Sequence, residues 1–121
     1  MKGKVNNNLI FDKDMKLKKG NIYDKIPSEL SNELFEIIAK KDSLKIERII
    51  SKGHTTPKEK WYDQKFNEFV ILIQGSAIIS FEDGNNIEMK KGDYINIPKH
   101  CKHRVEQTSS NPEAIWLAVH Y

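Results

Sequence analysis

Two stretches of the sequence contain side chains that could do acid–base or metal chemistry. The first leads through a loop to Glu68, which is followed by Gly75 seven positions later. The second starts at Gly92 and reaches His103 through Pro98. A carboxylate and an imidazole can exchange protons or share a metal ion if the fold brings them together. Glu68 and His103 are therefore the first candidates for a functional site.

Short β-strands are the elements that must position these two side chains. β-Branched and alternating runs are separated by turn signals such as Gly75, Asp83-Gly84 and Pro98. The expected strands are 44–51, 68–74, 77–81, 87–89, 94–97, 103–108 and 114–121. No helical pattern lies between them, which argues against a parallel α/β sheet and favours an all-β sandwich or barrel. Because side chains alternate along a strand, an inward His103 places Val105 and Gln107 on the same inner face.

The pattern before the first expected strand is different. Ser31 suits a helix N-cap, Glu33 and Glu36 suit a first turn, and Lys40-Lys41 suit a last turn. We therefore predict a short N-terminal helix near residues 31–40. Residues 1–20 are expected to be an extension, either an arm or a disordered end. Residues 21–121 are expected to form one β-barrel domain, which suits a chain of 121 residues.

Composition narrows the classes of function. The net charge of +3 lacks the clustered basic face that nucleic-acid binding asks for, so no nucleic-acid partner is expected. The single cysteine, Cys101, permits no internal disulfide and has no evident activating partner. No apolar run suggests a signal peptide or a membrane span, so we predict no membrane partner and a cytoplasmic location.

The glycine, proline and histidine spacing resembles the cupin family. Glu68 with Gly75 matches the end of the first cupin motif, and Gly92, Pro98 and His103 match the second. The likeness covers roughly residues 44–121. The S-x-G-x-x-x-P, W-Y-D-Q, H-R-V and W-L-A-V-H-Y stretches are similar to those of small bacterial cupins. The resemblance implies a double-stranded β-helix, or jelly-roll, barrel with a pocket near Glu68 and His103.

The chain departs from the family where cupins carry a His-x-His pair. Here the sequence is Trp61-Tyr62-Asp63-Gln64, and counting back from Glu68 places either Asp63 or Gln64 at the ligand position. His54, just upstream, could supply a nitrogen if its loop folds back. The resemblance thus implies a mixed set of His54, Asp63, Glu68 and His103. Such a set would suit a divalent metal ion, namely Zn, Mn, Fe or Ni.

The remaining expectations concern the pocket walls and the partners. Trp61, Tyr62 and Gln64 are expected to wall the pocket, joined by Trp116 and His120 if that face of the last strand points inward. An inward Glu68 leaves Phe69, Ile71 and Ile73 outward, and in cupins a second subunit often covers such a row. A homodimer is therefore expected. Two functions stay open: a metal-dependent protein acting on a small molecule, or a non-catalytic small-molecule, sugar-binding or accessory protein with a degenerate metal site.

Overall fold

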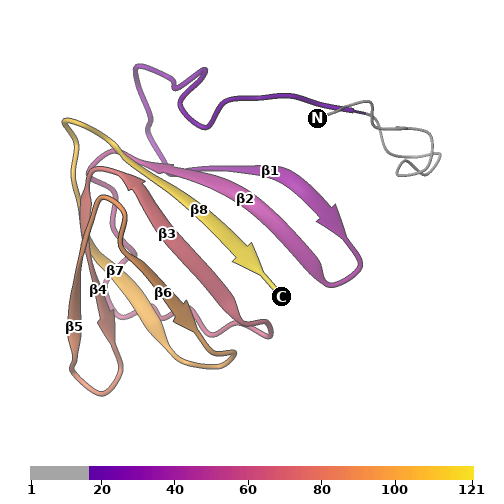
Figure 1. The fold of residues 1–121 in the computed structure, drawn as a ribbon. Coiled ribbons are helices and arrows are strands. Elements are labelled where there is room, and N and C mark those ends of the chain that lie inside the picture. Colours follow the sequence, from indigo (N-terminus) through magenta and orange to yellow (C-terminus); the bar gives the residue numbers. More distant parts are fainter. Residues whose placement is uncertain (1–16) are drawn as a thin grey trace.

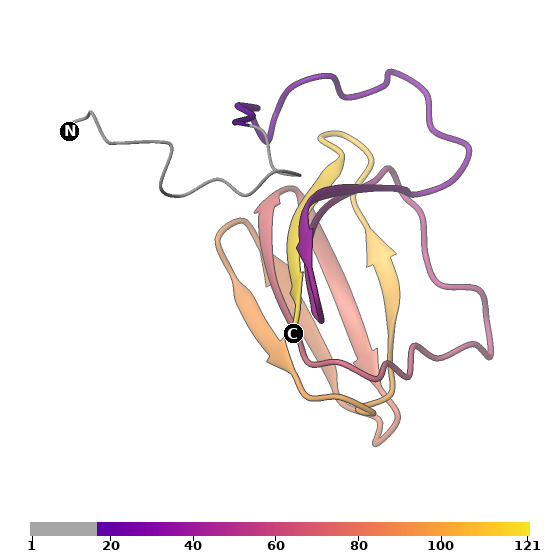
Figure 2. The same cartoon turned by 90° about the vertical axis from the view of Figure 1, so that its right-hand side faces the viewer.

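The computed structural model describes residues 17–121, which contain eight β-strands and no helix (Figure 1). The strands are β1 (Leu34–Lys41), β2 (Leu44–Ser51), β3 (Glu68–Gln74), β4 (Ser76–Phe81), β5 (Asn86–Lys90), β6 (Tyr94–Ile97), β7 (His103–Thr108) and β8 (Ala114–His120). They form a five-stranded sheet in the order β1-β2-β8-β3-β6 and a three-stranded sheet in the order β5-β4-β7. The two antiparallel sheets face each other (Figure 2), which confirms the all-β barrel prediction.

The predicted short helix at 31–40 is wrong, because that segment contributes to β1. Leu34–Lys41 pairs with β2 as an antiparallel hairpin, and Asp42 makes the turn at a φ of 53°. The β-branched pair Ile37-Ile38 suits a strand, and a helix this short has little stability of its own in water. Pairing with the edge of β2 satisfies the backbone groups of both strands. The prediction was wrong because a local residue pattern gives no information about this pairing.

The interior lies between the two sheets. Val70 and Leu72 of β3 and Trp116 and Ala118 of β8 point into it, and their neighbours on each strand point outward. Residues of the other sheet complete the core: Ala77, Ile79 and Met89 are all buried. This division of β3 and β8 into two faces determines which polar side chains can reach the interior.

A β-bulge changes the face of the last part of β7. Ile78 pairs with Gln107 and Ile79 with Val105, so Glu106 is left without a partner on β4. The extra residue reverses the alternation after Val105. Gln107 is therefore exposed, against the expectation that it shares the inner face with His103, and Thr108 is buried instead.

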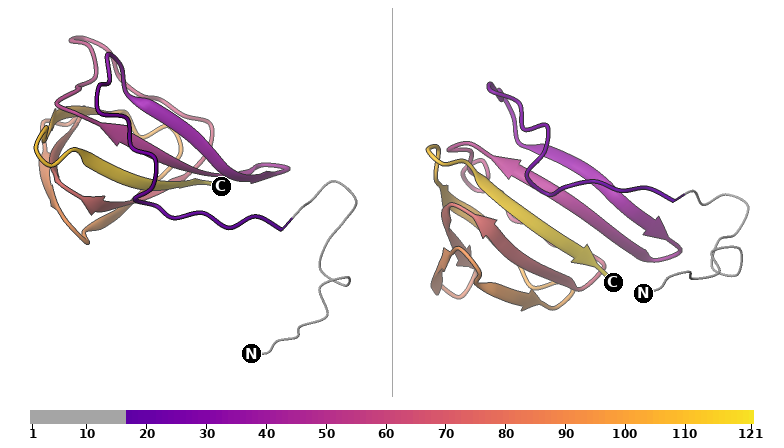
Figure 3. Two further views of the ribbon diagram at one scale, coloured as in Figure 1. Left: turned by 90° about the horizontal axis from the view of Figure 1, so that it is seen from above. Right: turned by 45° about the horizontal axis from the view of Figure 1, so that its top comes forward.

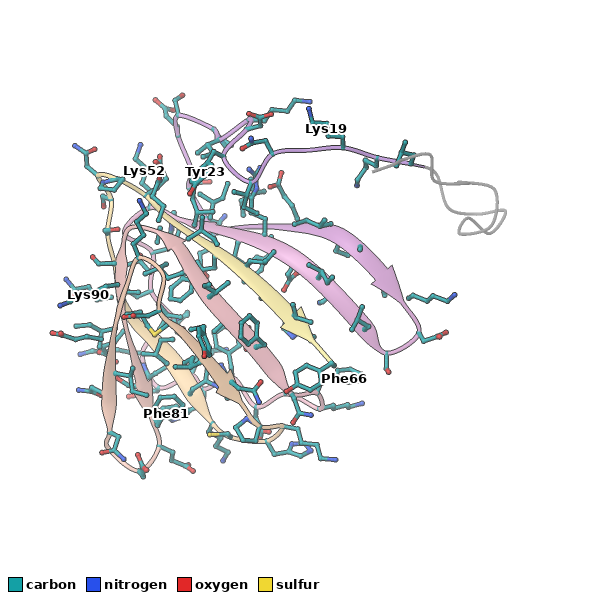
Figure 4. The ribbon with its side chains drawn as sticks, viewed as in Figure 1. Lys19, Tyr23, Lys52, Phe66, Phe81 and Lys90 are labelled. Atoms are coloured by element: carbon teal, nitrogen blue, oxygen red, sulfur yellow. The ribbon has the colours of Figure 1, made fainter. Side chains whose placement is uncertain are left out.

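The segment that precedes β1 runs outside the barrel in both views of Figure 3. Arg48 anchors it: its guanidinium donates to the carbonyls of Ile22 and Asp24 and pairs with Glu36. Tyr23 lies on this segment near the end of the barrel where Lys52 follows β2 (Figure 4). Residues 1–16 of the predicted N-terminal extension lie outside the described residues. In residues 17–121 no helix is long and apolar enough to cross a membrane.

Candidate functional site

A cavity with a volume of about 70 Å³ opens into the barrel between the two sheets. Its apolar wall includes Trp116 and Val70, and half-exposed Phe35 stands at its mouth. Five of its lining residues can carry charge: Glu33, Glu47, Glu68, His103 and His120. A cavity with apolar walls and a few converging polar groups is the usual form of a small-molecule site.

Glu68 and His103 meet across the cavity from different sheets. Glu68 begins β3 and His103 begins β7, and both side chains are buried. His103 Nε2 lies 3.5 Å from Glu68 Oε1. The inward position at the start of each strand brings together two groups that are 35 residues apart in the sequence.

The protonation of His103 is biased by its partners. Its Nδ1 donates to the Cys101 carbonyl at 2.9 Å, which leaves Nε2 facing the Glu68 carboxylate. A neutral ring would therefore aim a lone pair at a carboxylate. Burial by itself lowers the pKa of His103, but the contacts with Glu68 and the Cys101 carbonyl outweigh it and raise the pKa above its ordinary value of 6.5.

A second carboxylate–imidazole pair lines the same cavity. His120 Nε2 lies 2.9 Å from Glu47 Oε1, and both residues are buried. Glu47 is on β2 and His120 ends β8, directly opposite Glu68 on β3. Glu47 was not among the site residues predicted from the sequence; the available signal was its place on the same face of β2 as Ile49.

The loop after β2 decides which of the W-Y-D-Q side chains enter the cavity. It runs beside β7 (Figure 2), and Tyr62 forms a two-way backbone bridge with His103. Tyr62 and Gln64 consequently point inward and line the cavity, whereas Trp61 lies outside, against the Arg104 guanidinium. Asp63 pairs at the surface with His100, 2.8 Å away. Of the two alternatives for the family's ligand position, the structure places Gln64 in the cavity.

The Tyr62 phenol is held in its neutral form first by burial and then by two nearby carboxylates. Burial raises the pKa of the Tyr62 phenol, and the Glu33 and Glu68 carboxylates raise it further, against a smaller lowering by its hydrogen bond with Thr56. Glu33, which also accepts from the Ser51 hydroxyl, lies in the loop before β1. Because Glu33 was predicted to lie in a helix, its place at the cavity was not predicted from the sequence.

His54 does not line the cavity. Its Nδ1 accepts from the Lys52 amide at 2.9 Å, and its Nε2 lies 3.2 Å from the Leu30 carbonyl. Its own carbonyl accepts from the Thr108 hydroxyl. His54 thus joins the segment before β1 to the ends of β2 and β7.

Comparison with known proteins agrees with this architecture. A family model described as "Cupin domain" matches residues 47–120. The chain belongs to the cupin family. One solved cupin-fold neighbour is a proposed mannose-6-phosphate isomerase from Ralstonia eutropha JMP134. It is 39% identical, with a TM-score of 0.83, and the match covers 86% of this chain and 97% of the other.

More distant structures share the cupin fold alone. A cupin superfamily protein from Desulfitobacterium hafniense DCB-2 is 18% identical, with a TM-score of 0.66 and coverage of 78% of this chain and 82% of that chain. An RmlC-like cupin from Desulfovibrio desulfuricans is 12% identical, with a TM-score of 0.67 and coverage of 87% and 97%. Among curated proteins no similar sequence was found.

The cupin family implies a metal ion, and the donors of this chain supply only part of a site for one. Glu68 and His103 are close enough to share an ion with bonds of about 2.1 Å. However, His54 and Asp63 are engaged elsewhere, and Gln64 stands where a family histidine would be. Within residues 17–121, no group of three or more His, Cys, Asp or Glu side chains is arranged to hold a metal. The donor set does not fit the family's metal.

Proposed function

We propose that this cupin binds a small molecule inside its barrel, through protein side chains rather than through a bound metal. The observation that carries the proposal is the cavity in which apolar walls surround the buried Glu68–His103 pair. Burying an ionisable pair is costly, and a ligand that makes further hydrogen bonds to it would offset that cost. Tyr62, Gln64 and Trp116 would contact such a ligand from the surrounding walls.

The rival proposal is a metal-dependent enzyme. It is favoured by the 3.5 Å separation of Glu68 and His103, which suits two ligands of one ion. It requires a third donor, and the predicted ones, His54 and Asp63, would have to leave their present partners. Glu47 and His120 are the other candidates, but they are paired with each other.

The binding proposal is tested in solution by the indole N–H signals of the two tryptophans. Trp116 lines the cavity and Trp61 lies outside it, so a ligand in the barrel should move the NMR signal of Trp116 alone. Glu68→Gln and His103→Asn are expected to weaken binding of a small-compound panel about tenfold or more, because each removes a charge-assisted contact. His100→Asn alters a surface carboxylate–imidazole pair and is the matched control.

Metal content of the same purified proteins separates the two proposals. We expect the purified protein to retain less than about one-tenth of an equivalent of metal. Addition of Zn²⁺ or Mn²⁺ should leave the NMR signal of the Trp116 indole N–H unmoved. Stoichiometric metal that is lost in both Glu68→Gln and His103→Asn would contradict the binding proposal and support the enzyme. A panel in which no compound moves Trp116 would also contradict it.

We further infer that the outer face of the five-stranded sheet is covered by a second copy of the chain. Phe69 and Ile71 of β3 point outward there, and Tyr94 of β6, which packs against Phe69, is 65% exposed. An apolar row of this kind on an open sheet face favours association. The family resemblance also implies a dimer.

A further inference from the structure

The residues that line the cavity include more carboxylates than basic groups. Three carboxylates line it, those of Glu33, Glu47 and Glu68, against the two imidazoles of His103 and His120. Glu47 also faces the Lys45 ammonium, 3.8 Å from its Oε2, but Lys45 is not among the lining residues, so the cavity surface itself holds three carboxylates against two imidazoles. No lysine or arginine is among the lining residues of the described chain. Lys19, Lys52 and Lys90 all lie at the periphery of the barrel (Figure 4).

The hydrogen-bonding groups are unbalanced in the same direction. The nitrogens of His103 and His120 that face the cavity are already turned to Glu68 and Glu47. The side-chain oxygen of Gln64 is buried and has no hydrogen-bond partner among residues 17–121. A buried acceptor without a donor is costly, so the cavity is completed by a guest that donates hydrogen bonds.

The walls suit a guest that is partly apolar. Trp116 and Tyr62 present aromatic surface, and Phe35 lies at the mouth. Aromatic faces attract organic cations, and the attraction grows when water is excluded. Buried Glu47 and Glu68 act through a medium of lower effective dielectric than water, which strengthens their field on a cation.

We propose that the cavity selects an organic ammonium ion, with its charged nitrogen among the carboxylates and its carbon chain against the aromatic and aliphatic wall. This inference rests on the proposed small-molecule binding and names the class of ligand. It separates the chain from a phosphosugar enzyme, the class assigned to its Ralstonia eutropha neighbour. A phosphate in this cavity would meet three carboxylates, and none of the lining residues is a lysine or arginine that could pair with it.

The test uses three probes of equal chain length with the unaltered protein. n-Butylammonium is cationic, 1-butanol is its neutral analogue and butyrate is its anionic one. Titration of each against the Trp116 indole signal is expected to show n-butylammonium binding about tenfold or more tighter than 1-butanol, with butyrate weaker still. Mannose 6-phosphate should leave Trp116 unmoved, and Trp61 should not respond to any probe.

Single substitutions then identify which carboxylates produce the preference for the ammonium ion. Glu68→Gln and Glu47→Gln are each expected to lower the preference for n-butylammonium over 1-butanol by about tenfold, while keeping the cavity shape. Glu106→Gln makes the same change on the exposed outer side of β7 and should not alter the preference. Because the probe series needs no variant, a misfolded variant leaves the test intact.

The outcomes distinguish this inference from the proposed function. If 1-butanol, butyrate or mannose 6-phosphate shifts the Trp116 signal and binds as tightly as n-butylammonium, the ammonium preference is wrong while binding in the barrel stands. If Zn²⁺ or Mn²⁺ occupies the cavity and displaces n-butylammonium, the cation is a metal and the inference is overturned. If none of these probes moves the Trp116 signal, the ammonium inference is wrong, and the wider compound panel decides whether binding in the barrel stands.

Discussion

At the scale of single residues, His103 connects the two halves of the site. Its Nδ1 donates to the Cys101 carbonyl, and its Nε2 faces Glu68, so the two ring nitrogens have different partners. Its ring also lies 5.6 Å from the ring of Tyr62. The charge state of His103 therefore depends on its contacts with Glu68 and the Cys101 carbonyl and on its burial in the cavity wall.

The raised pKa of His103 predicts a pH dependence of stability. A histidine whose folded pKa exceeds its unfolded value stabilises the fold fully below the unfolded value. That contribution is lost as the pH rises from the ordinary value of 6.5 through the raised folded pKa. Urea unfolding between pH 5 and pH 9, with NMR titration of the His103 ring, should show both effects.

Glu68→Gln supplies the comparison for this pH dependence. Without the carboxylate, burial dominates and the pKa of His103 should fall, which removes or reverses its contribution to the slope of stability against pH. The substitution should lower the free energy of unfolding at pH 6 by about 1–3 kcal/mol. His100→Asn should leave the His103 titration unchanged. An unaltered His103 pKa in Glu68→Gln would show that the pair is not coupled.

At the scale of elements, the tight connection between β3 and β4 carries the chain from one sheet to the other. Gly75 makes this connection at a φ of 87°, and a Cβ there would lie 2.9 Å from the Ala114 backbone and 3.0 Å from the Glu113 carbonyl. Gln74 also donates to the Glu113 carbonyl. The glycine therefore allows β4 to leave the first sheet close beside the start of β8.

Gly75→Ala and Gly84→Ala form a matched pair that tests this packing. Gly84, in the turn between β4 and β5, also has a positive φ of 95°, but nothing lies within 4 Å of an added Cβ. Gly84→Ala should cost about 1–2 kcal/mol of unfolding free energy from backbone strain alone. Gly75→Ala should cost about 1–3 kcal/mol more, because the methyl group also meets backbone atoms. Equal losses in chemical denaturation would contradict the packing argument.

At the scale of the whole molecule, the five-stranded sheet has two different faces. Its inner face forms the cavity, and its outer face carries the apolar row of Phe69, Ile71 and Tyr94. Arg48 of β2 holds the segment before β1 to the sheet by donating hydrogen bonds to the carbonyls of Ile22 and Asp24. The proposed dimer would use the outer face at β3 and β6 and leave the cavity available to a ligand.

Ile71→Lys tests the proposed dimer. Placing a charge in an apolar interface should weaken association about tenfold or more, measured by light scattering over a dilution series. Ile78→Lys makes the same change on the outer side of β4 in the other sheet and is the matched control. An unaltered protein that is monomeric at every concentration, or equal dissociation of both variants, would contradict a dimer through this face.

The sequence by itself predicted what short-range physics controls. β-Branched runs and turn residues revealed the strands from residue 44 onward, and glycine and proline spacing placed Glu68 and His103 at strand starts that the structure brings to one cavity. These features were readable because alternation and turn chemistry depend on neighbours within a few residues. The cupin resemblance followed from the same local spacing.

Tertiary contacts decided the rest. Residues 31–40 look helical locally, but pairing with β2 makes Leu34–Lys41 a strand. The bridge between Tyr62 and His103 turned Tyr62 and Gln64 inward and left Asp63 outside. Glu47 and His120 are 73 residues apart in the sequence and meet only because β2 and β8 are adjacent. Such pairings are chosen by backbone hydrogen bonds and burial between distant segments, which no local pattern records.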